Sequence, residues 1–287
     1  MRFRNLDRYR VRREWDRYEG NALRDLFRTL RTRFLERNRP ATAFRSLDLG
    51  SGPGRFAPSI GARAGSTVLV DLSLEALRAA TIGLRSARGD RFAFVRGDAR
   101  KLPFSSGAFD QAVVLGNLLG VSGNALGSTV LEIDRVVAPD GHLIIEIVPG
   151  AGDRCAYLAR LPPGAVRRVL GSPHGWLTAR IEREGFRPSR PAPHSREQFR
   201  RISLDEIRGL LGARWTPREI LAVAPALGFD PQRLEAVRTD PDAWERLLLL
   251  EEELGHAPAR WANAASLLVA FDRIDAERGL RPSHAER

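Results

Sequence analysis

Three aspartates and a run of alternate glycines are the residues of this sequence whose types and spacing best suit ligand chemistry. The segment SLDLGSGPGRF at 46–56 holds Asp48 and then the alternate glycines Gly50, Gly52 and Gly54. Alternate glycines let a backbone pass close to a ligand, and the N-terminus of a following helix adds partial positive charge. A dinucleotide-binding loop is a second reading, although its third glycine belongs at Arg55, and a tight turn without a ligand is a third.

Two further carboxylates follow predicted strands. Asp71 comes directly after TVLV at 67–70, where a carboxylate can accept both hydroxyls of a ribose. Dinucleotide enzymes also place an acid there, so Asp71 indicates a nucleoside ligand without naming it. Asp98 follows a third apolar run in FVRGDA at 94–99. Each acid alone is also compatible with a solvated loop, but three at successive strand ends favour a nucleoside site.

The elements that must position these residues are short apolar runs that alternate with helical stretches. Strands separated by helices predict right-handed crossovers and a parallel sheet. A capping-box pattern predicts a helix over 203–211, and Asp240-Pro241 predicts one that runs to Leu254. Glu219–Val223 is predicted as a strand, although Thr216-Pro217 could equally cap a helix. The other expected strands are 44–49, 67–70, 92–95, 109–115, 142–148 and 265–271, and the other helices are 10–37, 55–63, 74–84 and 125–137.

The spacing at 46–56 resembles motif I of class I S-adenosylmethionine-dependent methyltransferases, in which an acidic residue precedes G-x-G-x-G. The GDA pattern at 97–99, the LPF loop at 102–104 and the turn PDGHLIIE at 139–146 resemble the same family. The resemblance covers 41–148 closely and 203–274 loosely. It implies an α/β fold, namely a Rossmann-like, doubly wound sheet of seven mostly parallel strands with an antiparallel last strand.

The resemblance also implies S-adenosyl-L-methionine as the cofactor. Asp98 would bind the adenine amino group and the Ala99 N–H the ring, and Asp48 is expected to organise the loop backbone. Tyr18, close to Trp15, lies in a segment that either closes over the cofactor or packs on the core. Asn117 either touches the methionine part or the acceptor, or caps the next helix. The implied cofactor-binding residues are Tyr18, Asp48, Gly50, Ser51, Gly52, Gly54, Asp71, Leu72, Asp98, Ala99 and Asn117.

The charge distribution suggests how the chain is organised around this site. Of 46 basic residues 45 are arginine, and the net charge is +7 over 1–40, +1 over 41–150, +7 over 151–215 and −4 over 216–287. We expect a single methyltransferase domain over 1–287. Its parts would be a basic N-terminal helical arm (1–40), a cofactor-binding half (41–148), a variable substrate or lid insertion (149–202) and a C-terminal part that completes the sheet (203–287).

Two basic segments around a near-neutral middle predict a basic lid and an anionic acceptor. The candidate acceptor contacts are Arg12, Arg13, Arg154 and Arg201. Arginine-rich composition alone, with solvated helix faces, is the other explanation. No catalytic base is identified. None of the candidates lies in a diagnostic motif, and such residues are more often structural than catalytic. The candidates are His174, His194, Tyr157 and Glu146.

Methyl transfer to an anionic small molecule is therefore the first functional hypothesis, and an RNA- or ribosome-directed methyltransferase is the second. A nucleotide-dependent oxidoreductase and a non-catalytic cofactor-binding protein are further alternatives. Five scattered histidines and the single Cys155 predict no metal site. The N-terminus has no apolar signal region and no apolar run reaches 18 residues, so a cytoplasmic location without a membrane span is expected. The acceptor atom and the oligomeric state do not follow from the sequence.

Overall fold

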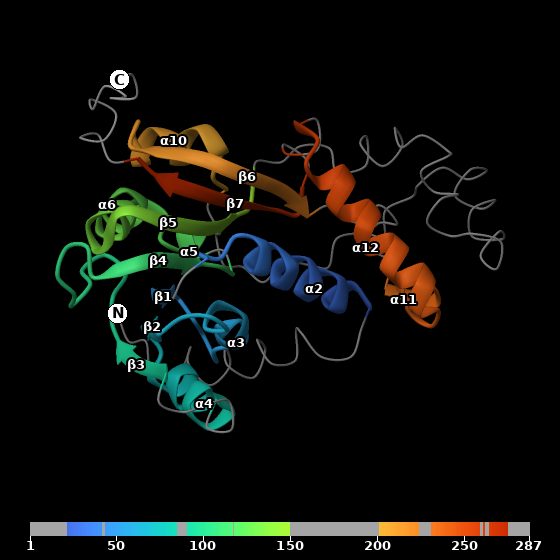
Figure 1. Ribbon diagram of the computed structural model, residues 1–287, viewed down its shortest axis with the longest axis horizontal. Coiled ribbons are helices and arrows are strands. Elements are labelled where there is room, and N and C mark those ends of the chain that lie inside the picture. Colours follow the sequence, from blue (N-terminus) through green and yellow to red (C-terminus); the bar gives the residue numbers. More distant parts are fainter. Residues whose placement is uncertain are drawn as a thin grey trace, which may run out of the picture. The chain divides into compact units, whose positions relative to one another are not determined.

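A seven-stranded sheet forms the centre of the computed structural model, which describes residues 22–41, 44–84, 91–116, 118–149, 201–223, 231–258, 261 and 264–274. The strand order is β3-β2-β1-β4-β5-β7-β6 (Figure 1). The strands are β1 (Arg45–Leu49), β2 (Ser66–Asp71), β3 (Phe92–Arg96), β4 (Phe109–Val114), β5 (Val137–Ile147), β6 (Trp215–Val223) and β7 (Ser266–Arg273).

The pairing of the strands confirms the predicted fold class. β1 pairs in parallel with β2 and β4, β2 with β3, and β4 with β5. β7 runs antiparallel to β6. The N–H of Ala265, just before β7, donates to the carbonyl of Val223 at the end of β6, and the N–H of Ile274, just after β7, donates to the carbonyl of Arg214, just before β6. The chain therefore winds outwards from β1 in both directions, and the carboxyl ends of the parallel strands lie along one edge.

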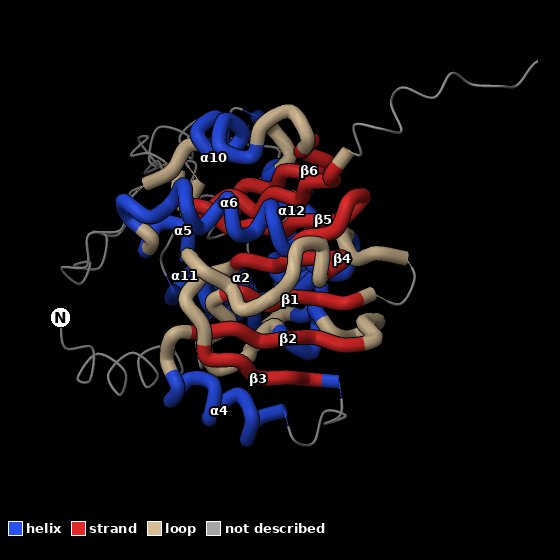
Figure 2. The backbone as a smooth tube through the Cα atoms, turned by 90° about the vertical axis from the view of Figure 1, so that its left-hand side faces the viewer, coloured by secondary structure: helices blue, strands red, loops and turns tan. Residues whose placement is uncertain are grey.

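α2 precedes β1, and among the described residues helices lie between the successive strands except between β3 and β4. Figure 2 distinguishes helices from strands by colour. Asp240 caps α12 as the sequence predicts, since its carboxylate accepts from the N–H groups of Asp242 and Ala243, each at 3.0 Å. The helices are α2 (Ala22–Arg37), α3 (Ala57–Ile60), α4 (Leu74–Leu84), α5 (Leu118–Val121), the 3₁₀ helix η3 (Gly123–Ala125), α6 (Leu126–Val136), α10 (Leu204–Leu211), α11 (Pro231–Arg238) and α12 (Pro241–Gly255).

Four elements differ from the expectations. Helix α3 is one turn long instead of spanning 55–63, because turns of the glycine loop continue through Phe56. Strand β5 begins at Val137, five residues early, and its bulge places Asp140 at φ +61°. Thr216-Pro217 lies within β6, so the helix-cap alternative is wrong. Helix α11 was not expected.

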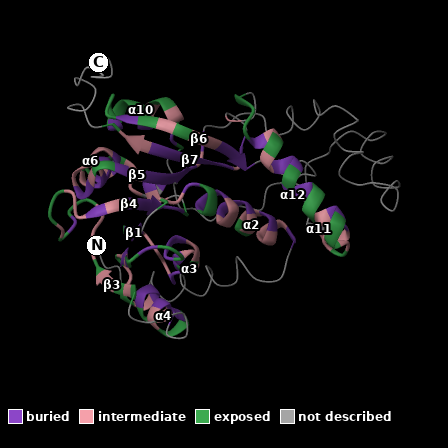
Figure 3. Cartoon of the chain, in the orientation of Figure 1, coloured by how far each residue is buried: buried purple, intermediate pink, exposed green. Residues whose placement is uncertain are grey.

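The described residues divide into two compact units. One holds α2, α11 and α12, which pack on one another, and the other holds β1 to β4, α3 to α6, and α10. In the second unit, α3 and α4 cover β2 and β3 through the buried cluster Ala57, Leu69, Leu77, Ala80 and Leu84. β1, β4 and β7 are mostly buried, whereas β3 is half-buried or exposed, and the helices alternate buried and exposed positions (Figure 3). The division of the whole chain into one domain with an arm and an insertion stays a prediction, because most of both lies outside the described residues.

Candidate cofactor site

The glycine loop connects β1 to α3 at the carboxyl edge of the sheet. Gly50, Gly52 and Gly54 have φ values of +72°, +54° and +75°, which L side chains rarely adopt. A Cβ atom at Gly50 would lie 2.9 Å from Leu118 Cδ2, and one at Gly54 would lie 3.0 Å from Leu69 Cδ2. At Gly52 no atom lies within 4 Å of such a Cβ. Packing therefore requires two of the glycines, and only Gly52 faces space that a ligand can enter.

Asp71 ties the glycine loop to the next helix. Its Oδ2 accepts from the Gly52 N–H at 2.8 Å and its Oδ1 from the Ser73 N–H at 2.8 Å. Ser73 Oγ in turn accepts from the N–H of Ala76 in α4 at 3.2 Å. The carboxylate that bonds the loop thus comes from β2, and the expectation that Asp48 organises the loop stays a prediction. Leu72, beside Asp71, has half of its surface exposed.

Asp48 is a buried carboxylate at the end of β1. It is 4% exposed, and its side chain makes no hydrogen bond or ion pair within the described residues. Burial and the neighbouring carboxylate of Asp71 raise the pKa of Asp48 to about 7. The site therefore contains two close acids, of which one is bonded to the backbone and the other is desolvated.

Asp98 lies at the end of β3, beside the strand that carries Asp71. The Gly97 N–H donates to the Asp71 carbonyl at 3.1 Å, so the two strand ends are adjacent. Arg100 Nε donates to both carboxylate oxygens of Asp98 at 2.9 Å, and this guanidinium holds the pKa of Asp98 below its ordinary value. Ala99 is half-buried in the turn between them. The sequence analysis did not identify Arg100, although a charge two residues from the acid was a visible signal.

Two residues of α6 hold the loop that follows Asp98. The Leu102 N–H donates to Glu132 Oε2 at 2.7 Å. Arg135 donates through Nη1 to the Phe104 carbonyl at 2.6 Å and through Nη2 to the Leu102 carbonyl at 3.1 Å. Arg135 Nε also bonds Glu132 Oε1 at 2.7 Å. The LPF loop is thus fixed through its backbone, which motif reading alone did not reveal.

The structure describes only some of the remaining candidate residues of the sequence analysis. Arg201 is exposed, whereas Glu146 is buried and accepts from Arg31 Nε at 3.1 and 3.0 Å, which makes it an ion-pair partner. No cluster of metal-ligating side chains and no helix able to span a membrane occurs in the part of the chain that the structure describes. The candidates that lie outside that part are Arg12, Arg13, Trp15, Tyr18, Asn117, Arg154, Tyr157, His174 and His194.

The basic stretch within α2 is paired with acids from the C-terminal part of the chain. Arg33 Nη2 lies 2.6 Å from Glu245, and Arg37 Nη1 lies 2.7 Å from Glu252. Arg238 of α11 returns an ion pair to Asp25 of α2. The excess charge of 22–37 is therefore partly neutralised within its own unit.

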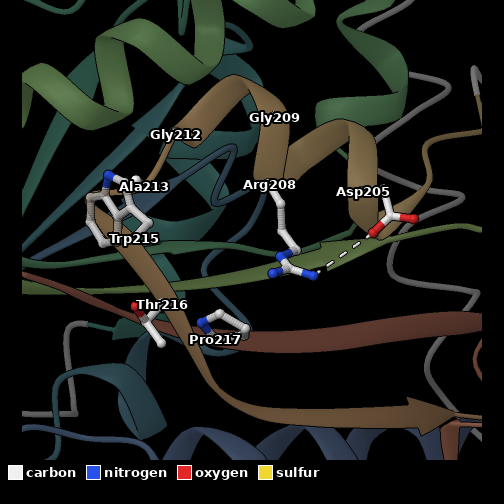
Figure 4. A pocket seen from close by; sticks show the side chains of 8 residues that line it. All are labelled: Asp205, Arg208, Gly209, Gly212, Ala213, Trp215, Thr216 and Pro217. Atoms are coloured by element: carbon white, nitrogen blue, oxygen red, sulfur yellow. Dashed lines mark ion pairs between the residues drawn. The ribbon is translucent and has the colours of Figure 1, made fainter.

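A separate pocket of about 520 Å³ lies between α10 and the start of β6 (Figure 4). Arg208 faces Asp205 across 3.9 Å at its rim. The pocket contains none of the candidate cofactor residues. Its lining residues are Asp205, Arg208, Gly209, Gly212, Ala213, Trp215, Thr216 and Pro217.

Comparisons with known proteins agree with this arrangement. Residues 47–145 match the family described as a methyltransferase domain. A demethylmenaquinone methyltransferase of Clavibacter sepedonicus is 33% identical over 107 residues, which are 37% of this chain and 42% of that protein. The chain thus matches less than half the length of this curated relative.

Solved structures with the same fold have low sequence identity. A chain from the complex of the Haloferax volcanii Trm112 methyltransferase activator is 18% identical with a TM-score of 0.54, covering 95% of this chain and 96% of that one. Burkholderia thailandensis 1,6-didemethyltoxoflavin-N1-methyltransferase, with S-adenosylhomocysteine bound, is 18% identical with a TM-score of 0.50, covering 93% and 84%. The [4+2]-cyclase SpnF, at 16% identity and a TM-score of 0.52, covers 85% and 80%.

The family match and the fold agree for this part of the chain. Residues 47–145 match a methyltransferase domain, and the sheet has the fold of these solved structures. Because a protein named as a cyclase has the same fold, the fold alone does not define the reaction.

Proposed function

We propose that this chain is an S-adenosylmethionine-dependent methyltransferase that binds its cofactor over Gly52. The single observation that carries the proposal is the open space at Gly52 inside a methyltransferase domain, beside three acids at adjacent strand ends. In this proposal Asp71 and Leu72 hold the ribose, and Asp98 and Ala99 hold the adenine. The bound cofactor would supply an electrophilic methyl group on a sulfonium.

The chain's own residues would bind and orient the reactants. Methyl transfer needs a nucleophile held in line with the methyl group, which is work of proximity and orientation. Glu132 and Arg135 support this role through the LPF loop, which they fix next to Asp98. The ion pair between Glu146 and Arg31 disfavours Glu146 as a general base, because an ionised partner stabilises its charged form.

For the acceptor we infer an anionic small molecule. The net charges of +7 over 1–40 and over 151–215 support an anion. The candidate contacts are Arg12 and Arg13, beside the 15–18 segment, and Arg154 and Arg201, which flank the insertion. Two similar proteins are named for small molecules, demethylmenaquinone and 1,6-didemethyltoxoflavin. RNA is the second candidate, favoured by the same arginines, but aromatic residues for base stacking make up only 7% of the chain.

Calorimetry with S-adenosylhomocysteine and NAD tests the cofactor assignment. The protein should bind S-adenosylhomocysteine and not NAD, and Gly52→Val should abolish binding because its side chain enters the open space. Gly212→Val is a matched control, since Gly212 has φ +73° and no atom within 4 Å of its Cβ, but lies at the turn before β6 (Figure 4). Unchanged affinity in a folded Gly52→Val variant would contradict the assignment.

A further inference from the structure

Arg100 occupies the carboxylate that the proposed function assigns to the adenine base. Asp98 Oδ1 accepts from both the backbone N–H and Nε of Arg100 at 2.9 Å. Oδ2 accepts from Nε at 2.9 Å and also from Nη2. These contacts use three N–H hydrogens of Arg100, and the Nε hydrogen is shared between the two oxygens, so both oxygens of a carboxylate with about four lone-pair sites are engaged. A ligand amino group that bonds Asp98 therefore competes with the guanidinium.

The ion pair is accessible to such a competitor. The side chain of Arg100 is 61% exposed and that of Asp98 is 33% exposed. Ion pairs of this exposure contribute little because water solvates both partners, so displacement of Arg100 should weaken ligand binding only about twofold to fivefold. The competition is therefore compatible with binding, yet large enough to measure.

Asp98 and Arg100 favour purines with different hydrogen-bonding groups at position 6. The amino group at position 6 of adenine is a hydrogen-bond donor and needs the carboxylate, whereas a carbonyl at that position is an acceptor and needs a donor. A guanidinium has five N–H donors and no acceptor. Hence Asp98 favours a 6-aminopurine, and Arg100 in the same place favours a 6-oxopurine.

We propose that Arg100 is a specificity-determining residue of the base subsite, which competes with adenine for Asp98 and donates to the carbonyl of a 6-oxopurine. The inference rests on the proposed cofactor site and adds the residue that sets its base selectivity. It predicts that the native protein discriminates between adenosyl and inosyl ligands less strongly than a variant without the guanidinium.

The test measures the affinities of S-adenosylhomocysteine and S-inosylhomocysteine by calorimetry. Arg100→Ala should bind the adenosyl ligand about twofold to fivefold more tightly and the inosyl ligand about fivefold more weakly or worse. In an Asp98→Ala background, Arg100→Ala should no longer tighten adenosyl binding, because the acceptor for which the two donors compete has gone. Arg78→Ala removes one exposed positive charge from α4 and should change neither affinity.

The outcomes separate this inference from the proposed function. Tight binding of the adenosyl ligand by the native protein, with weaker or equal binding by Arg100→Ala, would overturn the role of Arg100 alone. Absence of adenosyl binding by the native protein would overturn the proposed function and this inference together. Opposite shifts for the two ligands would support both.

Discussion

At the scale of single residues, the two neighbouring acids of the candidate site have different tasks. Asp71 is bonded to the N–H groups of Gly52 and Ser73, whereas Asp48 is buried without a hydrogen bond among the described residues. The consensus position of an acid before the glycines does not reveal this difference. It follows from the side-chain geometry, which brings the second strand's acid onto the loop.

Asp48 makes the stability of the protein depend on pH. Its pKa is about 7 in the folded state against an ordinary value of 3.8, so between these pH values the folded state keeps a proton that the unfolded chain has lost. The stabilisation is fully present below about pH 4 and is lost as the pH rises through about 7, by on the order of 4 kcal/mol. Asp48→Asn should remove this loss and should be the more stable protein at pH 8.

Urea unfolding of the native protein and of Asp48→Asn at pH 5 and pH 8 measures the effect. The difference in unfolding free energy between the two proteins should grow with pH. If the difference in unfolding free energy is the same at pH 5 and at pH 8, Asp48 ionises in the folded state as it does in the unfolded chain.

At the scale of elements, three polar side chains lie side by side across the middle of the sheet. Ser46 of β1 is in register with Thr67 of β2 and with Gln111 of β4. Their exposures are 0%, 0% and 1%, and Ser46 Oγ, Thr67 Oγ1 and Gln111 Oε1 have no hydrogen-bond partner among the residues described. A buried hydroxyl without a partner destabilises a protein by about 1–3 kcal/mol.

Thr67→Val should therefore stabilise the protein, by about 1 kcal/mol, because it keeps the shape and removes the unpaired hydroxyl. Thr129→Val is the control, since Thr129 is equally buried but bonds Ser122 Oγ at 3.4 Å, and it should be neutral or destabilising. The measurement is the free energy of unfolding in urea. A loss of stability in Thr67→Val would instead indicate an internal water that bonds the hydroxyl.

The ion pairs between α2 and α12 give a second prediction at this scale. Glu252 lies 2.7 Å from Arg37 and 3.6 Å from Arg33. Glu252→Gln should lower the unfolding free energy by about 0.5 kcal/mol in low salt and by less in 1 M salt, where exposed charges are screened. Glu253→Gln changes an exposed neighbour and should have no effect. Equal losses at both salt concentrations would show that packing, not charge, is affected.

At the scale of the whole molecule, the uneven charge bears on the acceptor. If the arginines outside α2 form a positive field, Arg12→Glu combined with Arg201→Glu should raise the KM of an acidic acceptor at least tenfold while cofactor affinity stays nearly unchanged. Arg78→Glu changes an exposed residue of the near-neutral segment 41–150, is the control and should leave KM nearly unaltered. Equal turnover of neutral and acidic acceptors, without an effect of moderate salt, would refute the field.

The sequence by itself determined the succession of the strands along the chain, the position of the glycine loop and most helix ends, whereas the order of the strands in the sheet comes from the structure. These depend on signals within a few residues, such as the Asp240-Pro241 cap and the apolar period over 74–84, which α4 matches from end to end. Local chemistry also located the acids at the ends of β1, β2 and β3, because parallel strands bring their carboxyl ends to one edge. Turn geometry was harder to predict from the sequence, because the bulge of β5 and the shortness of α3 depend on how neighbouring strands pack.

Only the tertiary structure decided which partner each charged side chain has. Asp71 rather than Asp48 bonds Gly52, and Arg37 meets Glu252 from more than 200 positions away. Glu146, a candidate base in the sequence, is neutralised by Arg31 from a distant helix. The physical reason is range: hydrogen bonds and ion pairs act over a few ångströms, so their partners are set by the packing of elements and not by distance along the chain.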